Sequence, residues 1–370
     1  RSNAPFRRML SFGALLPLIS PPFVTSLAFL LLFGRRGLIT YKLLGLNINL
    51  YGWKGIVFVQ TLGHIPLAFL IISATLMEIN GTLEDAAYNL GASKWCVFRQ
   101  VTLPLLAPGL VSAVLLIFIR AMADFGTPML VGGNFQTLAP AAYLQVVGLY
   151  DLEMAAVLCI VLLIPCLLLY FLHDFLLRRI SYATITGSST YGEVLGISGL
   201  VKWALFSLAL VVGVVNLLQY SFVVIGSFAK FWGYDYSFTL DHYNFAWKHG
   251  LQPLLNSVLM AIPAAAIGAL LGVFLAYFIV RKRFFGRQLL DFTTAIPFVV
   301  PGTVVGIGYI LAFHHPPLLL TGTFIILIIS CIFRFLPVGY KAGMTNLEQI
   351  EQSIEEASLN RLLNLFQIGH

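Results

Sequence analysis

Residues 15–24 read LLPLISPPFV, and the same pattern returns at residues 295–304 as AIPFVVPGTV. The two prolines of each copy align in one register, Pro17 with Pro297 and Pro21 with Pro301. Repetition in a fixed register is typical of a chain built from two related units. Proline also breaks a helix, because it lacks the backbone N–H and clashes with the preceding turn. We therefore expect two related halves, each with a helix broken at a matching depth.

The composition identifies lipid as the solvent of these halves. Of 370 residues, 59% are hydrophobic and only 10% are charged, and the mean hydropathy is +0.90. A water-soluble fold is excluded, because so few charges cannot cover its surface. Stretches of about 20 apolar residues predict membrane-spanning helices. Eight such spans are predicted, near residues 10–33, 55–77, 105–123, 154–177, 201–226, 254–280, 289–313 and 318–340.

The positions of Lys and Arg orient these spans. Cytoplasmic loops are enriched in basic residues, and most of the Lys and Arg between spans fall on one side, among them Lys94, Arg99 and the run 281–287. The loop at 34–54 is an exception, because its four basic residues would lie outside. The net charge of +7 therefore reflects membrane topology, and we expect contact with a lipid bilayer and no nucleic acid partner.

The repeat also divides the chain. We expect a first half at 5–183, a small and polar linker at 184–199, and a second half at 200–370. Each half has spans for which the other shows no counterpart. Adding those counterparts gives an expected twelve spans, with spans missing before the first half and after the second. The predicted fold class is an all-α polytopic helical bundle with two pseudo-symmetric halves.

One segment on the basic side has the character of a docking element. Residues 84–109 read EDAAYNLGASKWCVFRQVTLPLLAPG, which predicts a short helix, a bend at Gly91 and a second short helix over 94–101. Leu103-Pro104 should end that second helix and open the next span. A helix–Gly–helix unit with an amphipathic face can lie in a partner's groove, or it can simply connect two spans at the membrane surface.

The string E-D-A-A-x-x-L-G-A, followed by V-T-L-P, resembles the coupling motif in the membrane permease subunits of binding-protein-dependent ABC importers. The resemblance implies that this helix docks into a cytoplasmic ATP-hydrolysing subunit. The motif positions in the first half are Glu84, Asp85, Ala86, Ala87, Gly91, Ala92, Leu103 and Pro104. The second copy matches at Glu355, Glu356 and Ala357, and then departs, because Arg361-Leu362-Leu363 replaces the expected Leu-Gly-Ala.

Two such halves in one chain, with FGRRGLIT at 33–40 and ADFGTPMLVGG at 123–133, are most similar to the fused permeases of ferric-iron uptake. The resemblance implies a multi-pass protein of the bacterial inner membrane. Two copies of an ABC ATPase would bind coupling helices at 80–103 and 346–360, and a periplasmic binding protein would deliver substrate. ATP and magnesium would be bound by the ATPase, so no cofactor or metal is expected in this chain.

Prolines and charges inside the spans are candidates for the translocation path or gate. Unwound backbone inside a membrane is tolerated only where it is buried in protein or lines a cavity, which favours the proline pairs. Arg120 and Asp124 lie one helical turn apart, so they either line the path or form a structural pair, and Arg334 has the same two interpretations. The candidate path residues are Pro17, Pro21, Pro297, Pro301, Arg120, Asp124 and Arg334.

No phosphate-binding loop, zinc motif or nucleophile–base arrangement occurs in the sequence, so we expect a transport subunit that is not itself an enzyme. Ferric iron is the first choice of substrate by resemblance. Similar permeases serve polyamines, thiamine, phosphonates and sugar phosphates. The alternative from another class is an ion-coupled secondary transporter, which predicts several acidic residues at mid-membrane.

Overall fold

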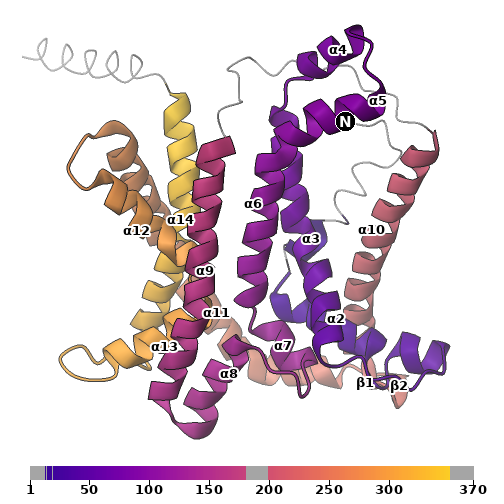
Figure 1. The fold of residues 1–370 in the computed structure, drawn as a ribbon. Helices are drawn as coiled ribbons and strands as arrows, with labels where there is room; N and C mark the ends of the chain where they lie inside the picture. The colour runs from indigo at the N-terminus through magenta and orange to yellow at the C-terminus, as the bar shows by residue number, and fades with distance from the viewer. Residues whose placement is uncertain (1–12, 14, 19, 181–198, 351–370) are drawn as a thin grey trace, which may run out of the picture. The chain divides into compact units, whose positions relative to one another are not determined.

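The computed structural model describes residue 13 and residues 15–18, 20–180 and 199–350 (Figure 1). Contacts divide the chain into two compact units at Ala246 and Trp247. Among the described residues, seven helices are long and apolar enough to cross a membrane, or eight if one sharply bent pair counts as a single span. The predicted all-α polytopic fold is therefore confirmed.

The described residues of the first unit form α-helices and three short π-helical segments. Its helices are α2 (Pro22–Phe33), α3 (Trp53–Glu78), α4 (Gly81–Asn89), α5 (Lys94–Val97), α6 (Leu103–Met122), α7 (Gly126–Val131), α8 (Leu138–Leu144), α9 (Leu152–Ile180) and α10 (Gly199–Ser227), preceded by the described part of a helix at residues 13–18. The π-helical segments are η1 (Leu38–Leu43), η2 (Phe98–Thr102) and η3 (Gln145–Leu149).

Packing within the first unit follows the order of its spans with one exception. Helix α3 packs on α6, and α6 packs on α9, whereas α10 packs on α2, far away in sequence. Phe29, Val59 and Val131 form a buried cluster where α2, α3 and α7 meet. The segments α4 and α5 lie at one end of α3 and α6, and α7 and α8 lie at the other end (Figure 1).

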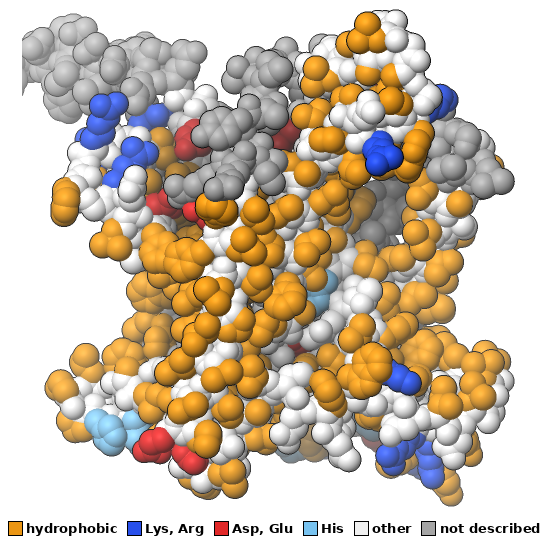
Figure 2. All heavy atoms as spheres, viewed as in Figure 1, with side chains coloured by type: hydrophobic (Ala, Val, Ile, Leu, Met, Phe, Trp, Pro, Cys, Tyr) orange, Lys and Arg blue, Asp and Glu red, His pale blue; other side chains and the backbone are white. Residues whose placement is uncertain are grey.

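Many apolar side chains of the long helices are exposed. Along α9, Val157, Ile160, Ile164, Leu168 and Phe171 recur every three or four residues and are at least half exposed. The opposite face of the same helix is buried at Ala155, Cys159, Leu162 and Cys166. Figure 2 shows hydrophobic side chains covering the sides of the helices. A stripe of this spacing on one face is typical of a helix that faces lipid.

The first unit ends in a small hairpin that the sequence does not predict. Strands β1 (Ala229–Phe231) and β2 (Asp235–Phe238) pair antiparallel after α10. Phe228 stacks on Phe238 with ring centroids 5.5 Å apart, which fixes the hairpin at the end of α10. This is a local exception in an otherwise helical chain.

The second unit contains most of α11 (Asp241–Arg281), together with α12 (Arg287–Val299), α13 (Gly302–Phe313) and α14 (Phe324–Gln349). Three predicted spans differ here. Helix α11 begins at Asp241, well before residue 254, and α14 runs from 324 to 349 instead of 318 to 340. The predicted span 289–313 is two helices bent by 108°, because the prolines interrupt it.

Small residues allow close packing inside the second unit. A side chain at Gly272 would come within 3.0 Å of the backbone of Gly339 and Tyr340, so α11 and α14 touch there backbone to backbone. Gly302 and Gly306 have the same spacing as Gly268 and Gly272, but an added side chain at either position would meet no described atom within 4 Å.

Candidate coupling segment and helix breaks

The segment between α3 and α6 is a helix–turn–helix defined by two caps and one glycine. The side chain of Asn80 accepts from the Thr82 N–H at 3.1 Å and caps α4. Ser93 caps α5 by accepting from Cys96 N–H at 3.3 Å. Between them Gly91 has φ +84°, a left-handed conformation that glycine adopts at no steric cost. The predicted bend at Gly91 is therefore present.

Glu84 is buried in this segment, although it is the first acid of the predicted motif. Its side chain is only 7% exposed, and its Oε1 accepts a 2.6 Å hydrogen bond from the hydroxyl of Thr102. Thr102 is the last residue of η2, directly before α6. The bond therefore ties α4 to the base of a membrane-spanning helix, and a carboxylate held in this way is not presented to a partner.

Several large apolar side chains of the segment are exposed, among exposed polar ones. Leu90 is 90% exposed and Trp95 is 68% exposed, and the Trp95 ring stacks on Phe98 at 5.6 Å. Among the predicted motif positions, Ala86 and Gly91 are exposed, whereas Asp85, Ala87 and Ala92 are half-buried. A concentration of large apolar side chains at the end of a span is a signature of a contact surface.

Tyr88 adds a polar group to this segment. Partial burial, and after it the negative charges of Glu84 and Asp85, raise the pKa of the Tyr88 hydroxyl above its ordinary value. A tyrosine hydroxyl is protonated at neutral pH even at its ordinary pKa, so this one can donate a hydrogen bond.

The helix after Ser93 does not end at Leu103-Pro104, so this prediction is wrong. Helical backbone continues from Lys94 to Met122, through α5, η2 and α6. Pro104 stands at the start of α6, where its ring and missing N–H are accommodated by the wider π-helical turn before it. The second short helix of the segment and the span are thus one continuous helix. Leu103 and Pro104 are both exposed at this junction. The predicted second coupling positions, Glu355, Glu356 and Ala357, lie outside the described residues.

The two predicted helix breaks have nearly the same backbone. Pro21 has φ −58° and ψ 142° before α2, and Pro301 has φ −56° and ψ 140° before α13. Pro17 is buried and Pro297 is half-buried, one turn before each break. The repeat seen in the sequence is therefore a repeat of backbone geometry.

Different side chains hold the two breaks. The guanidinium of Arg334 donates a 2.6 Å hydrogen bond to the carbonyl of Val300, the residue directly after α12. At the first break, Ser20 donates weakly to the Pro17 carbonyl at 3.4 Å and shares a 2.6 Å hydrogen bond with the hydroxyl of Tyr220 on α10. A charged group thus supports the second break and neutral hydroxyl groups support the first.

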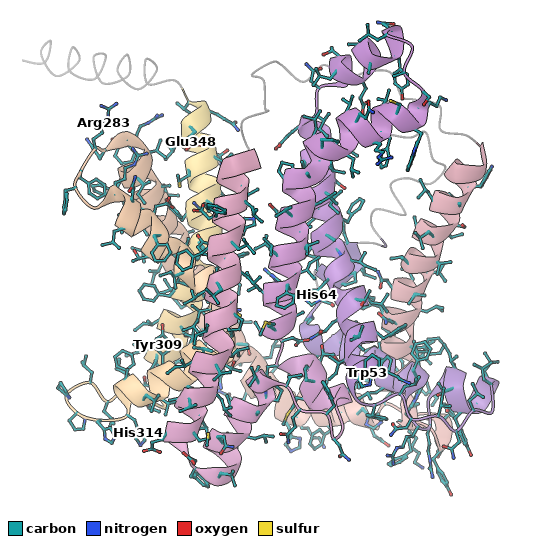
Figure 3. The ribbon with its side chains drawn as sticks, viewed as in Figure 1. Trp53, His64, Arg283, Tyr309, His314 and Glu348 are labelled. Atoms are coloured by element: carbon teal, nitrogen blue, oxygen red, sulfur yellow. The ribbon has the colours of Figure 1, made fainter. Side chains whose placement is uncertain are left out.

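Asp124 connects the end of α6 to neighbouring helices. Its carboxylate accepts from the side chain of Gln60 at 3.1 Å and from the Thr127 N–H at 3.2 Å, so it links α3 to the start of α7. Arg120 lies one turn earlier near the end of α6. His64, at the middle of α3 (Figure 3), places Nδ1 2.6 Å from the Gln60 carbonyl.

Sequence reasoning missed several partners of the predicted residues. Thr102, Gln60 and Tyr220 each bond to a predicted site residue or its neighbour. Polar residues inside spans are expensive, so Gln60 and Tyr220 could have been singled out on that ground. Thr102 carries no such signal, because its role depends on the fold of α4.

Comparison with known proteins assigns the sequence to a family. Residues 1–182 match the family model described as "Binding-protein-dependent transport system inner membrane component". Molybdenum transport system permease protein ModB of Haemophilus influenzae is 34% identical over 171 residues, which make up 44% of this chain and 74% of that protein. The chain belongs to the family of binding-protein-dependent inner membrane transport components. The predicted resemblance to ABC importer permeases is therefore confirmed.

Longer matches within the family cover both halves. Ferric transport system permease protein FbpB of Actinobacillus pleuropneumoniae is 37% identical over 358 residues, which are 94% of this chain and 52% of that protein. Putative ferric transport system permease protein FbpB 1 of Haemophilus influenzae is 36% identical over 94% of this chain and 57% of that protein. The chain thus spans about half the length of these relatives. No solved structure matches it.

Proposed function

We propose that this chain is the membrane permease part of an ABC importer in the bacterial inner membrane. A periplasmic binding protein delivers substrate to the outer face, and two copies of a separate ATPase drive its passage. The coupling segment carries the proposal. It is a helix–turn–helix with exposed apolar side chains, its second helix is continuous with a membrane span, and it belongs to a chain with a binding-protein-dependent family match.

We propose that the ATPase is coupled to the span by two sets of residues, one that contacts the ATPase and one that attaches α4 to α6. Leu90, Trp95 and Phe98 provide the apolar contact with the ATPase, because large exposed apolar side chains dominate the energy of such contacts. Glu84 and Thr102 hold α4 on the base of α6, so a displacement of the contact surface is passed to the span. ATP binding then shifts the population of two states of the permease, to the extent that the ATPase binds one state more tightly.

The gate is proposed at the two helix breaks. Backbone groups released inside a membrane must be satisfied by protein or face a cavity. The backbone angles at Pro21 and Pro301 agree closely, and each break is held by side chains from another helix. Movement of α14 or α10 would therefore change the break that it supports. Arg120 and Asp124 stay proposed members of the same path.

Ferric iron is the proposed substrate. The support is the match over 94% of the chain to proteins named as ferric transport permeases. Relatives named for molybdenum transport match only about half of the chain, which indicates that the permease half is shared by systems with different substrates. Polyamine, thiamine, phosphonate and sugar phosphate remain alternatives that the same machinery could carry.

The test is copurification from the native membrane. The protein that contains this chain should copurify with an ABC ATPase, and the ATPase activity of the complex should rise when the iron-loaded binding protein is added. A secondary transporter would instead purify without an ATPase, and its uptake would follow a proton or sodium gradient. That second result would overturn the proposal.

A further inference from the structure

Helix α10 carries two buried carboxamide side chains within its membrane-spanning stretch. Asn216 is 0% exposed and Gln219 is 1% exposed. They lie three residues apart, which places both on the same face of the helix. The residues before them, 208–215, are apolar or glycine. Polar side chains inside a membrane are expensive, so their presence calls for a specific role.

Only one of these two side chains has a hydrogen bond among the described residues. The Nδ2 of Asn216 donates to the Gly13 carbonyl at 3.2 Å, and its Oδ1 has no partner there. The amide nitrogen and oxygen of Gln219 both lack a partner in the same part of the chain. The bond to Gly13 therefore distinguishes two otherwise similar carboxamides.

The carbonyl that Asn216 reaches is the one that Pro17 leaves free. In a regular α-helix the N–H of each residue bonds to the carbonyl four residues earlier, so the regular partner of the Gly13 carbonyl is residue 17. Proline has no backbone N–H. A carbonyl without a partner is strongly unfavourable inside a membrane, where no water replaces the lost bond. Asn216 therefore supplies the donor that Pro17 lacks.

Further contacts place α10 along the first break. An added side chain at Gly13 would come within 3.2 Å of the Gly213 Cα, so the two backbones lie close together there. The hydroxyl of Tyr220 shares a 2.6 Å hydrogen bond with Ser20. Helix α10 thus contacts the chain on both sides of Pro17 and fixes the position of the break in the structure.

The second break has a donor from another helix as well. Arg334 of α14 donates to the Val300 carbonyl, directly before Pro301. A carboxamide that merely joined two helices could bond to any polar group on the facing helix, whereas the bond of Asn216 goes to the carbonyl that lost its donor. The position of the bond therefore favours support of the break over general helix association.

We propose that Asn216 is a positioning residue of the first helix break. It replaces the hydrogen bond that Pro17 cannot make, and thereby ties the break to α10. Its role in transport rests on the proposed function, which places the gate at the helix breaks. With the bond in place, a displacement of α10 carries the break with it. Without the bond the break no longer follows α10, so ATP is hydrolysed with less passage of substrate.

A double-mutant cycle on the complete purified protein tests the hydrogen bond itself. Asn216→Leu keeps a similar volume without the donor, and it should lower the melting temperature in detergent because the Gly13 carbonyl loses its partner. Pro17→Ala restores a backbone N–H at residue 17, which can bond to that carbonyl. In the Pro17→Ala background, Asn216→Leu should therefore lower the melting temperature by much less, since the two positions are coupled.

Gln219→Leu is the matched control for this cycle. It removes a carboxamide from the same buried face, but one that has no hydrogen-bond partner among the described residues, so the melting temperature should stay the same or rise. An equal loss for Asn216→Leu in both backgrounds would overturn the inference, because the bond would then not depend on the missing proline donor. A loss for Gln219→Leu as large as that for Asn216→Leu would also overturn it.

Transport supplies the readout that a purely structural role would not change. Radiolabelled ferric iron taken up per ATP hydrolysed is measured in proteoliposomes that contain the complete permease and its ATPase, with the iron-loaded binding protein outside. This ratio does not depend on the fraction of folded protein. Asn216→Leu should lower it at least about threefold, the size expected for one side-chain hydrogen bond inside a membrane, and Gln219→Leu should leave it unchanged. An unaltered ratio in Asn216→Leu would refute the positioning role.

The two measurements separate failure of this inference from failure of the proposed function. If the unchanged protein takes up no iron with ATP, or yields no ATPase on copurification, the proposed function fails, and the melting-temperature cycle still tests the bond between Asn216 and Gly13. If ATP-driven uptake is present and the cycle shows no coupling between positions 17 and 216, this inference alone fails.

Discussion

The hydroxyl of Thr102 donates a 2.6 Å hydrogen bond to the buried carboxylate of Glu84, across the junction between α4 and α6. A hydrogen bond to a charged group contributes about 1.5–3 kcal/mol. Thr102→Val should therefore lower the thermal stability of the purified protein and reduce substrate-stimulated ATPase activity more strongly than ATPase binding. Unfolding in detergent and ATPase assays on the same preparations measure the two effects.

Two conservative variants control that prediction. Thr102→Ser keeps the hydroxyl and should behave like the unchanged protein, and Glu84→Gln keeps an acceptor for it and should retain more activity than Glu84→Ala. If Glu84→Ala and the unchanged protein showed the same substrate-stimulated ATPase activity, the positioning role of Glu84 and Thr102 would be contradicted.

Leu90 should be a main contact for the ATPase, because it is 90% exposed on the coupling segment. Leu90→Asp places a charge in an apolar contact, and loss of a central contact of this kind costs about 2 kcal/mol or more. ATPase recovery on copurification should fall by at least about tenfold at limiting concentration. Leu149→Asp, at a residue that is 69% exposed in η3 directly after α8, should leave recovery unchanged. Equal recovery for the two variants would show that Leu90 is not a contact for the ATPase.

Arg334 should be needed to hold the second helix break. Arg334→Met leaves the half-buried carbonyl of Val300 without its 2.6 Å donor, and a polar group left unpaired away from water costs about 1–3 kcal/mol. We expect transport to fall sharply while the protein still inserts and binds the ATPase. Arg334→Lys retains a donor and should recover part of the rate. Full transport by Arg334→Met in a reconstituted assay would refute this role.

Gly272 should tolerate no larger side chain. Gly272→Val would push into the backbone of Gly339 and Tyr340, which already lie within 3.0 Å of an added Cβ, and overpacking costs about 1–3 kcal/mol. The melting temperature in detergent should fall. Gly306→Ala is the matched control, because no atom lies within 4 Å of that position. A lower melting temperature for Gly306→Ala than for Gly272→Val would contradict the packing described here.

The spans and breaks could be predicted because their signals are local. Apolar length fixes a membrane helix whatever its neighbours, and proline interrupts a helix through its own ring. The repeat between 15–24 and 295–304 therefore predicted two breaks whose backbone angles agree closely at Pro21 and Pro301. The glycine at position 91 could likewise be assigned to a bend from its type alone.

The partners of the site residues could not be predicted, because they are set by tertiary contacts. The sequence places Glu84 in the first turn of a short helix and gives no sign that it is buried. In the structure its side chain accepts a hydrogen bond from Thr102. The sequence predicts that a helix ends at Pro104, but the helix is continuous there because a π-helical turn precedes the proline. Gly302 and Gly306 have the spacing of a packing motif, and only the structure shows that no described atom would lie within 4 Å of a side chain added at either position.

Uptake of radiolabelled ferric iron into proteoliposomes tests the central claim most directly. The vesicles would contain the complete permease with its ATPase, and the binding protein would be supplied outside. We predict uptake only when ATP is enclosed and the binding protein is present, and its loss in the Leu90→Asp variant. Uptake that proceeds without ATP, driven by an ion gradient, would contradict the account.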